Sequence, residues 1–180
     1  FHSWGGVYHN ESFTWQGKKY WAKDDGTFYT GVCDINGKKY YFLEDGEQIT
    51  KEGWYLTNGT YYWINKDTSL QTGWVKYDNN WYWMKEDGTM ASSEWITYDK
   101  NRYYFRSWGG MYKNAFITYD NNLYYLGSDS KMAIGWQSIG GNTYYFRNWG
   151  GMITGKQVID GKTYVFDEDG KLVQSPDGFE

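Results

Sequence analysis

The sequence predicts an all-β fold, a solenoid of stacked β-hairpins with about eight repeats of 20–21 residues. Three observations lead to this prediction. Tyrosines recur at that spacing, short aromatic runs alternate with Asn-Gly and Asp-Gly turn dipeptides, and Trp, Tyr and Phe make up 23% of the chain. A unit of this length cannot bury its own apolar face, so neighbouring units are expected to stack.

The periodic tyrosines mark the second strand of each predicted hairpin. They are Tyr20, Tyr40, Tyr61, Tyr82, Tyr103, Tyr124, Tyr144 and Tyr164. Two β-prone runs joined by a dipeptide such as Asn36-Gly37 are typical of a hairpin with a tight primed turn. A second turn such as Asp45-Gly46 closes the unit. We expect the array over residues 10–174, after a partial repeat at 1–9 and before a tail at 175–180.

Strand alternation divides the side chains of each second strand between two faces. One face carries the periodic tyrosine and the residue two positions later, and we assign it to a core built largely from aromatic rings. The later residues are Ala22, Phe42, Trp63, Met84, Phe105, Leu126, Phe146 and Phe166. The opposite face mixes aromatic, basic and hydroxyl side chains, which favours ligand binding. Its central residues are Trp21, Tyr41, Tyr62, Trp83, Tyr104, Tyr125, Tyr145 and Val165.

Composition and motifs argue against catalysis, metal binding, nucleic acid and membrane insertion. The net charge of −4 offers no basic face. No apolar run approaches the roughly 20 residues of a membrane helix. Acidic pairs such as Glu86-Asp87 recur beside glycine and are typical of turns, not of paired glycosidase carboxylates. His2 and His9 both lie in the leading fragment and Cys33 stands alone, so no catalytic residue, metal site or cofactor is expected.

These motifs resemble the cell-wall-binding repeat superfamily over nearly the whole chain, to about Gln174. That superfamily includes choline-binding repeats of Gram-positive surface proteins and autolysins, glucan-binding repeats of bacterial glucosyltransferases, and repeats of clostridial toxins. The segment 35–42 is closer to the glucan and toxin repeats, whereas Gly73-Trp74 with Trp81-Tyr82-Trp83 is closer to the choline repeats. The resemblance implies a non-catalytic binding module of a secreted or cell-surface bacterial protein, attached to a larger enzyme or surface protein.

The resemblance leaves two ligand classes open. In choline-binding relatives aromatic rings form a cage around a quaternary ammonium, and the transferred pattern yields one complete cage, of Trp74, Trp81 and Tyr104. Repeat three offers Thr60 in place of the second ring, and repeat five offers Arg102, whose charge repels choline. A sugar needs an aromatic platform and hydrogen-bonding groups such as Arg102. The predicted platforms are the pairs Trp54/Tyr62, Trp74/Trp83, Trp95/Tyr104, Phe116/Tyr125 and Trp136/Tyr145.

Three closing turns carry tryptophan where other repeats carry an acidic residue. They are Ser3-Trp4-Gly5-Gly6, Ser107-Trp108-Gly109-Gly110 and Asn148-Trp149-Gly150-Gly151. We expect Trp108 and Trp149 either to bind ligand or to fold back over their own hairpins.

The main functional prediction is therefore a module that binds a polysaccharide, either an α-glucan or a cell-wall or host glycan, through repeated aromatic sites. Weak repeated sites on one chain act together on a repetitive ligand. The alternative is a choline-binding module that anchors to teichoic acid of the cell wall. A third possibility is a structural spacer or a protein-adhesion array.

Overall fold

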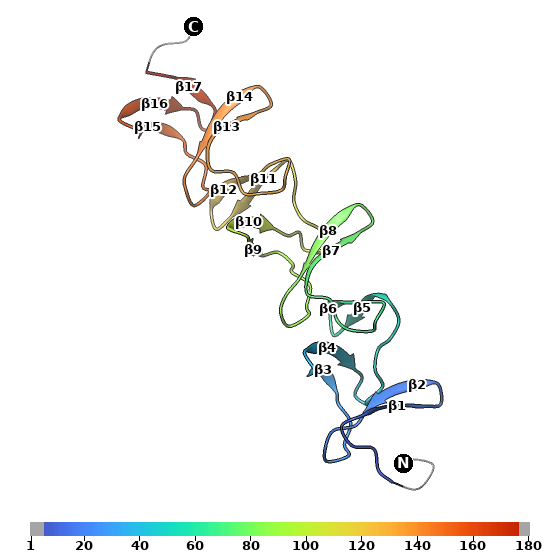
Figure 1. Ribbon diagram of the computed structural model, residues 1–180. Coiled ribbons are helices and arrows are strands. Elements are labelled where there is room, and N and C mark those ends of the chain that lie inside the picture. Colours follow the sequence, from blue (N-terminus) through green and yellow to red (C-terminus); the bar gives the residue numbers. More distant parts are fainter. Residues whose placement is uncertain (1–5, 177–180) are drawn as a thin grey trace. The chain divides into compact units, whose positions relative to one another are not determined.

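The computed structural model describes residues 6–176 and confirms the all-β prediction: in this range all regular secondary structure is strand. The chain divides into two compact units, Phe1–Ser92 and Ser93–Glu180. Figure 1 shows the hairpins that follow one another in each. Residues Phe1–Gly5, with Trp4, lie outside the described range, and the predicted boundaries of the array remain predictions.

Eight small antiparallel sheets contain the strands of the described residues. The first unit holds the hairpins β1(Ser12–Trp15)–β2(Lys18–Trp21), β3(Gly31–Ile35)–β4(Lys38–Phe42), β5(Gly53–Thr57)–β6(Thr60–Ile64) and β7(Gly73–Tyr77)–β8(Asn80–Met84). The second holds β9(Trp95–Tyr98)–β10(Asn101–Tyr104), β11(Ala115–Tyr119)–β12(Asn122–Leu126), β13(Gly135–Ile139)–β14(Asn142–Phe146) and β15(Gly155–Ile159)–β16(Lys162–Phe166), the last extended by β17(Leu172–Gln174).

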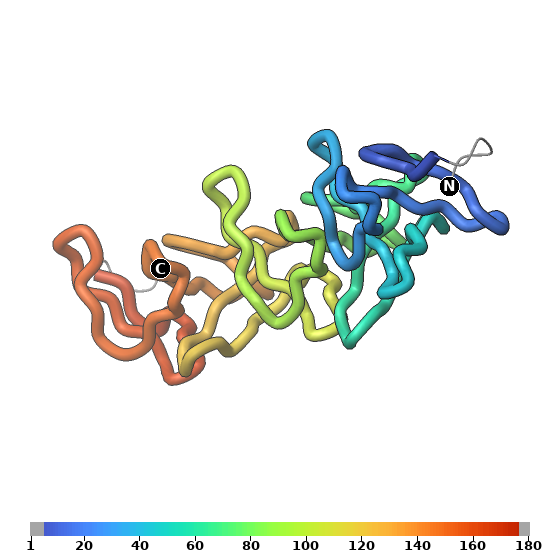
Figure 2. Tube along the Cα trace, turned by 90° about the horizontal axis from the view of Figure 1, so that it is seen from below, coloured from blue at the N-terminus to red at the C-terminus, as the bar shows by residue number. Residues whose placement is uncertain are grey.

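The hairpin turns are of the primed type, as the sequence predicts. Both central residues have positive φ, for example 54° at Asn36 and 76° at Gly37. This geometry matches the twist of the paired strands, and Asn and Gly tolerate it better than other residues. Asp78 and Asn79 adopt it as well, at 46° and 60°. The turns project from each unit as narrow loops (Figure 2).

Within each unit, main-chain hydrogen bonds connect the loop after a hairpin to the hairpin before it. The amide of Leu70, which follows β6, donates to the carbonyl of Lys39 in β4 (2.7 Å). The next amide, that of Gln71, donates to Trp63 of its own hairpin (2.8 Å). Equivalent bonds link Met132 to Arg102 and Met152 to Leu123 (both 2.8 Å). These bonds use only main-chain groups, so every repeat can form them whatever its side chains.

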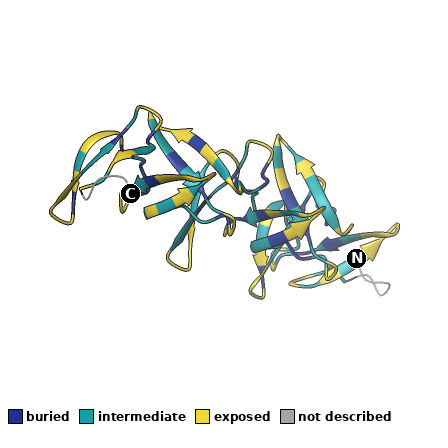
Figure 3. Ribbon diagram, turned by 90° about the horizontal axis from the view of Figure 1, so that it is seen from above, coloured by how far each residue is buried: buried dark blue, intermediate teal, exposed yellow. Residues whose placement is uncertain are grey.

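The core lies between these loops and one face of the strands. The third and fifth residues of most second strands are buried, as in Tyr82 and Met84 of β8, whereas hairpin tips are exposed (Figure 3). Aromatic rings supply about half of the buried apolar residues: Tyr20, Phe42, Tyr62, Tyr82, Tyr103, Phe105, Tyr124, Tyr144, Phe146 and Phe166.

The predicted face assignment is wrong in the third hairpin. There Tyr62 (9% exposed) and Ile64 (0%) face the core, whereas Tyr61 (39%) lies on the open face, which it shares with Trp63 by strand alternation. The loop between Phe42 and Gly53 is two residues longer than the loop between Ile64 and Gly73. A strict 20–21-residue spacing therefore selects Tyr61, although Tyr62 is the equivalent of Tyr40. Because strand side chains alternate, this error of one residue exchanged the two faces.

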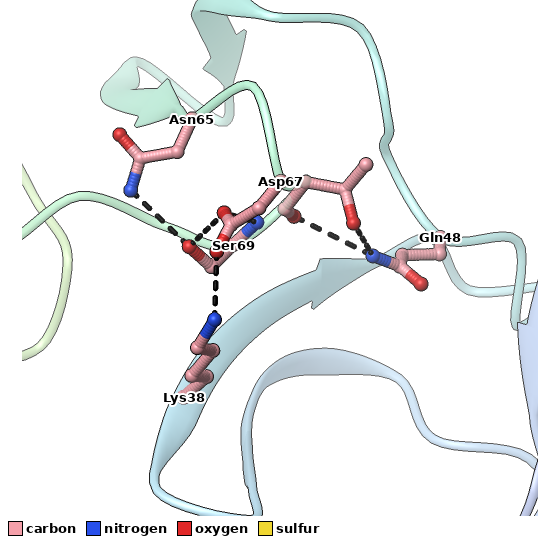
Figure 4. Close-up of polar contacts among 6 residues, drawn as sticks. Lys38, Gln48, Asn65, Asp67 and Ser69 are labelled. Carbon is pink, nitrogen blue, oxygen red and sulfur yellow. Dashed lines mark hydrogen bonds and ion pairs between the residues drawn. The ribbon is translucent and has the colours of Figure 1, made fainter.

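Polar side chains add contacts between repeats of the first unit (Figure 4). Lys38 Nζ lies 2.8 Å from the Asp67 carboxylate, which also accepts bonds from the amide and hydroxyl of Ser69. These bonds hold the pKa of Asp67 well below its usual range, and the bond from Lys38 has the largest effect. Gln48, 2% exposed, donates to the Thr68 hydroxyl (2.9 Å) and accepts from the Trp21 indole (3.2 Å). The acidic residues of these turns therefore act in turn formation, as predicted.

Closing-turn glycines pack on the preceding loop, which gives a test of stacking. A Cβ at Gly46 would lie 2.7 Å from Cβ of Phe28, whereas one at Gly37 would meet nothing within 4 Å. Both residues have positive φ, 86° and 76°. We expect Gly37→Ala to cost about 1–2 kcal/mol of unfolding free energy and Gly46→Ala about 1–3 kcal/mol more. Urea denaturation of both variants measures the difference, and equal losses would contradict a packing role for this contact.

Candidate ligand-binding sites

The most complete aromatic cluster in the first unit is built on hairpin β5–β6. Trp54 of β5 faces Trp63 of β6 across the strand pair, with ring centroids 5.1 Å apart and planes at 88°. Tyr77, from the end of β7, lies 6.2 Å from Trp54 at 88° and 5.4 Å from Trp63 at 60°. Tyr61 lies 6.0 Å from Trp54 at 83°. Rings from two neighbouring hairpins thus contact one another at steep angles and form one aromatic cluster.

Hairpin β7–β8 repeats this arrangement. Trp74 lies 4.9 Å from Trp83 at 81° and 6.0 Å from Trp81 at 83°, almost the values of the previous hairpin. Trp81 is 42% exposed, and Lys76 Nζ lies over its ring at 5.8 Å. The matching geometry follows from the register, because the same strand positions face each other in both hairpins.

In the second unit, hairpin β9–β10 keeps the cross-strand ring pair and the ring from the following hairpin. The residue at the position of Tyr61 is not aromatic. Trp95 lies 5.0 Å from Tyr104 and 6.2 Å from Tyr119, at 61° and 86°. Arg102 stands where Tyr61 and Trp81 stand in the first unit, and its guanidinium lies over the Trp95 ring at 4.6 Å. Burial and then the neighbouring Tyr119 raise the pKa of Tyr104, which keeps this phenol uncharged. The aromatic cluster around Trp95 thus already contacts a positively charged side chain of the protein itself, that of Arg102.

The last two predicted platforms are pairs without an aromatic ring at the position of Tyr61. Phe116 lies 4.8 Å from Tyr125, beside Leu123, and Trp136 lies 5.0 Å from Tyr145. Thr143 fills that position beside Trp136. Phe116 and Trp136 remain 38% and 39% exposed. The planes of Phe116 and Tyr125 are inclined by 52° and those of Trp136 and Tyr145 by 74°, so these pairs keep inclined rings and differ by the missing aromatic residue.

The closing-turn tryptophans fold over glycine. A Cβ at Gly110 would lie 1.9 Å from the Trp108 ring, and one at Gly151 would lie 2.0 Å from the Trp149 ring. The paired glycines of this motif thus make room for the indole, and the Trp149 ring also lies 6.0 Å from Tyr124 of the preceding hairpin instead of over its own hairpin. Trp108 and Trp149 are nevertheless 50% and 43% exposed. Any ligand contact there remains a prediction.

Several sequence-predicted partners differ in space. Tyr62, predicted as a platform beside Trp54, packs in the core with Ile64 and Leu70, and Trp63 takes its place. The second ring of that repeat is Tyr61, not Thr60. Tyr104 pairs with Trp95 of its own hairpin, as one of the predicted platforms requires, and the cage of Trp74, Trp81 and Tyr104 remains a prediction. Tyr77 and Tyr119 were missed, although each ends a strand whose second residue is aromatic, and that shared position was the available signal.

Two related family profiles match most of this chain. The profile described as a choline-binding repeat matches residues 133–175. The profile described as a putative cell wall binding repeat matches residues 34–47, 72–90, 93–111 and 114–129. The chain belongs to the cell-wall-binding repeat superfamily. Repeats of this superfamily form a binding module, and their presence indicates a cell-surface or secreted location. No curated protein sequence matches the chain significantly.

Solved structures of Streptococcus pneumoniae proteins share this repeat architecture. CbpJ of strain TIGR4 is 26% identical with a TM-score of 0.74, over 89% of this chain and 61% of that one. Choline binding protein F, solved with a peptidoglycan analogue, is 25% identical with a TM-score of 0.70, over 91% and 59%. The choline-binding domain of CbpL is 25% identical with a TM-score of 0.65, over 93% and 94%. The chain thus spans about three fifths of the first two proteins and nearly all of the CbpL domain.

Between residues 6 and 176 no three His, Cys, Asp or Glu side chains are grouped as metal ligands. The same range contains no helix that is long and apolar enough to span a membrane.

The turn motif yields a prediction for Trp108. In Gly110→Ala the new methyl group occupies the space of the indole, so we expect the ring to swing into solvent and become more accessible to iodide quenching. Because Trp108 is already half exposed, the unfolding free energy should change by less than about 1 kcal/mol. In the matched Trp108→Phe background the same substitution should leave quenching unchanged. Unchanged quenching in the parent chain would show that the ring does not rest on Gly110.

Proposed function

We propose that this module binds choline through the aromatic clusters of its first unit, and that it anchors an attached protein to choline-bearing teichoic acid of a cell wall. The observation that carries the proposal is the repeated cluster: Trp54, Tyr61 and Trp63 have nearly the same mutual distances and angles as Trp74, Trp81 and Trp83. A recurring geometry built from exposed rings is expected of a recurring ligand site.

The chemistry of these clusters suits a quaternary ammonium. The faces of aromatic rings attract cations, by about 0.5–2 kcal/mol per ring according to desolvation. Trimethylammonium cannot donate a hydrogen bond, so it gains from apolar walls that would leave a sugar hydroxyl without a partner. Tyr61, Tyr77 and Trp81 are 39%, 48% and 42% exposed, so solvent reaches the clusters.

The relatives favour choline over the glycan predicted first. The chain covers nearly all of a domain described as choline-binding, that of CbpL, and one family profile is that of a choline-binding repeat. A glycan remains the second candidate because choline binding protein F was solved with a tetrasaccharide-pentapeptide. The exposed pairs Phe116/Tyr125 and Trp136/Tyr145 are the platforms that would suit it.

Substituting the first ring of each cluster tests the choline proposal. Choline titrated against the tryptophan fluorescence of the whole chain should give a saturable change. Trp54→Ala and Trp74→Ala should each remove part of it, with affinity at the affected site at least about 10-fold weaker. Trp15→Ala serves as the matched control, because Trp15 is 58% exposed and lies outside both clusters. Saturation by oligosaccharides with no response to choline would reverse the proposal.

A gain of binding is expected in the second unit. Arg102→Tyr replaces the guanidinium over Trp95 with a ring at the position of Tyr61, so the site should lose its cation and accept choline. Isothermal titration should then show about one more choline equivalent per chain than the parent. Arg102→Gln, which removes the charge without adding a ring, should bind choline there much more weakly than Arg102→Tyr. An unchanged number of equivalents in Arg102→Tyr would mean that Arg102 does not decide specificity.

A further inference from the structure

A groove at equivalent positions of the repeat occurs in both units. In the first unit it is lined by the β3–β4 turn, the loop after β6 and Glu86 of a closing turn. In the second it is lined by the β9–β10 turn, the loop after β12 and Asn148 of a closing turn. Lys39 and Arg102 correspond, because the loop amides of Leu70 and Met132 donate to their carbonyls. The two grooves have similar volumes, about 370 and 400 Å³.

The charges that line the two grooves differ. In the first groove Lys38 lies 2.8 Å from Asp67 and Lys39 lies 3.3 Å from Asp34. Glu86 adds a further carboxylate to the lining. Each lysine of this groove is therefore neutralised by the chain itself, and an anionic ligand would have to compete with fixed carboxylates.

The second groove carries three cations and one carboxylate. Lys100, Arg102 and Lys131 line it with Asp129, which lies 3.3 Å from Lys131. Arg102 is held against the Trp95 ring at 4.6 Å, and its Nη1 lies 3.9 Å from Met132 Sδ. A guanidinium stacked in this way loses less conformational entropy when it binds, and its planar fork matches a phosphate.

Side-chain amides complete the lining of the second groove. Asn101 donates from Nδ2 to the Asp99 carbonyl (2.7 Å), and Gln137 donates from Nε2 to the Ile134 carbonyl (2.9 Å). These bonds fix both side chains, and their amide oxygens are acceptors for hydroxyl groups. Asn148 lines the same groove. Cations beside fixed amides suit a ligand that has an anionic group next to hydroxyl groups.

We propose that the groove of the second unit is a binding site for a phosphate group carried on a small polyol or sugar. The site is built only from residues of the second unit and does not depend on choline binding in the first unit. Its ligand class is shared by free polyol phosphates and by polyol-phosphate polymers. The first groove serves as a control of the same shape with neutralised charge.

Glycerol 3-phosphate is the probe, and the readout is the shift of ¹⁵N backbone amide signals in the whole chain. Saturable shifts are expected at residues 100–102 and 131–134, with none at residues 38–39. Arg102→Gln should weaken binding at least about 10-fold, and Lys131→Gln should weaken it as well. Lys39→Gln, the equivalent change in the first groove, should leave affinity unchanged. Equal shifts in both grooves, or full affinity in Arg102→Gln, would overturn the proposal.

Three further ligands separate the parts of the proposal. Glycerol alone should not bind, since it lacks the anion. Inorganic phosphate should bind more weakly than glycerol 3-phosphate, and equal affinity would overturn the polyol part. A poly(glycerol phosphate) chain should bind more tightly per phosphate than the monomer if the polymer is the source, whereas equal affinity per phosphate identifies the free ester. Choline titrated in the same samples reports on the first unit separately, so either proposal can fail alone.

Discussion

The main-chain bond that connects a loop to the preceding hairpin of the same unit is the interaction on which the rest of the structure depends. It joins Leu70 to Lys39 and Met132 to Arg102, among others, with almost constant length. An isolated two-stranded hairpin is barely stable in water, so each repeat needs its neighbour to cover its apolar face. Because the bond uses only the backbone, it sets the spacing of repeats and leaves the open-face side chains to vary.

That freedom explains how one scaffold carries different sites. The second position of the second strand is Tyr61 in one repeat, Trp81 in the next and Arg102 in the third, while the first-strand tryptophan that contacts it is kept. An aromatic residue at this position adds a ring face that can attract a bound cation. Arginine at this position places a positively charged side chain there instead. The same substitution places a guanidinium in the polar groove on the neighbouring loop. One residue thus changes two neighbouring surfaces, which suits a module whose ligand combines a cationic group with phosphates.

The sequence predicted hairpins, primed turns and most of the core because these depend on local patterns: turn dipeptides, alternation and a nearly constant spacing. It failed where spacing was not constant. The longer loop after Phe42 moved the register by one residue, and Tyr62 was assigned to the open face although it is buried. No propensity distinguishes Tyr61 from Tyr62, since both are β-prone rings. Packing against Leu70 decides between them.

By itself the sequence determined the repeat, the strand faces in most units, the turn role of the acidic residues and the presence of candidate rings. Only the tertiary structure decided which rings of different hairpins meet and where the turn tryptophans pack. Tyr77 reaches Trp54 from the following hairpin, and Trp108 folds onto Gly110. Such contacts depend on how one hairpin is placed on the next, to within a few ångströms. The order of residues fixes what each strand can present, but the packing of neighbouring repeats selects the partners.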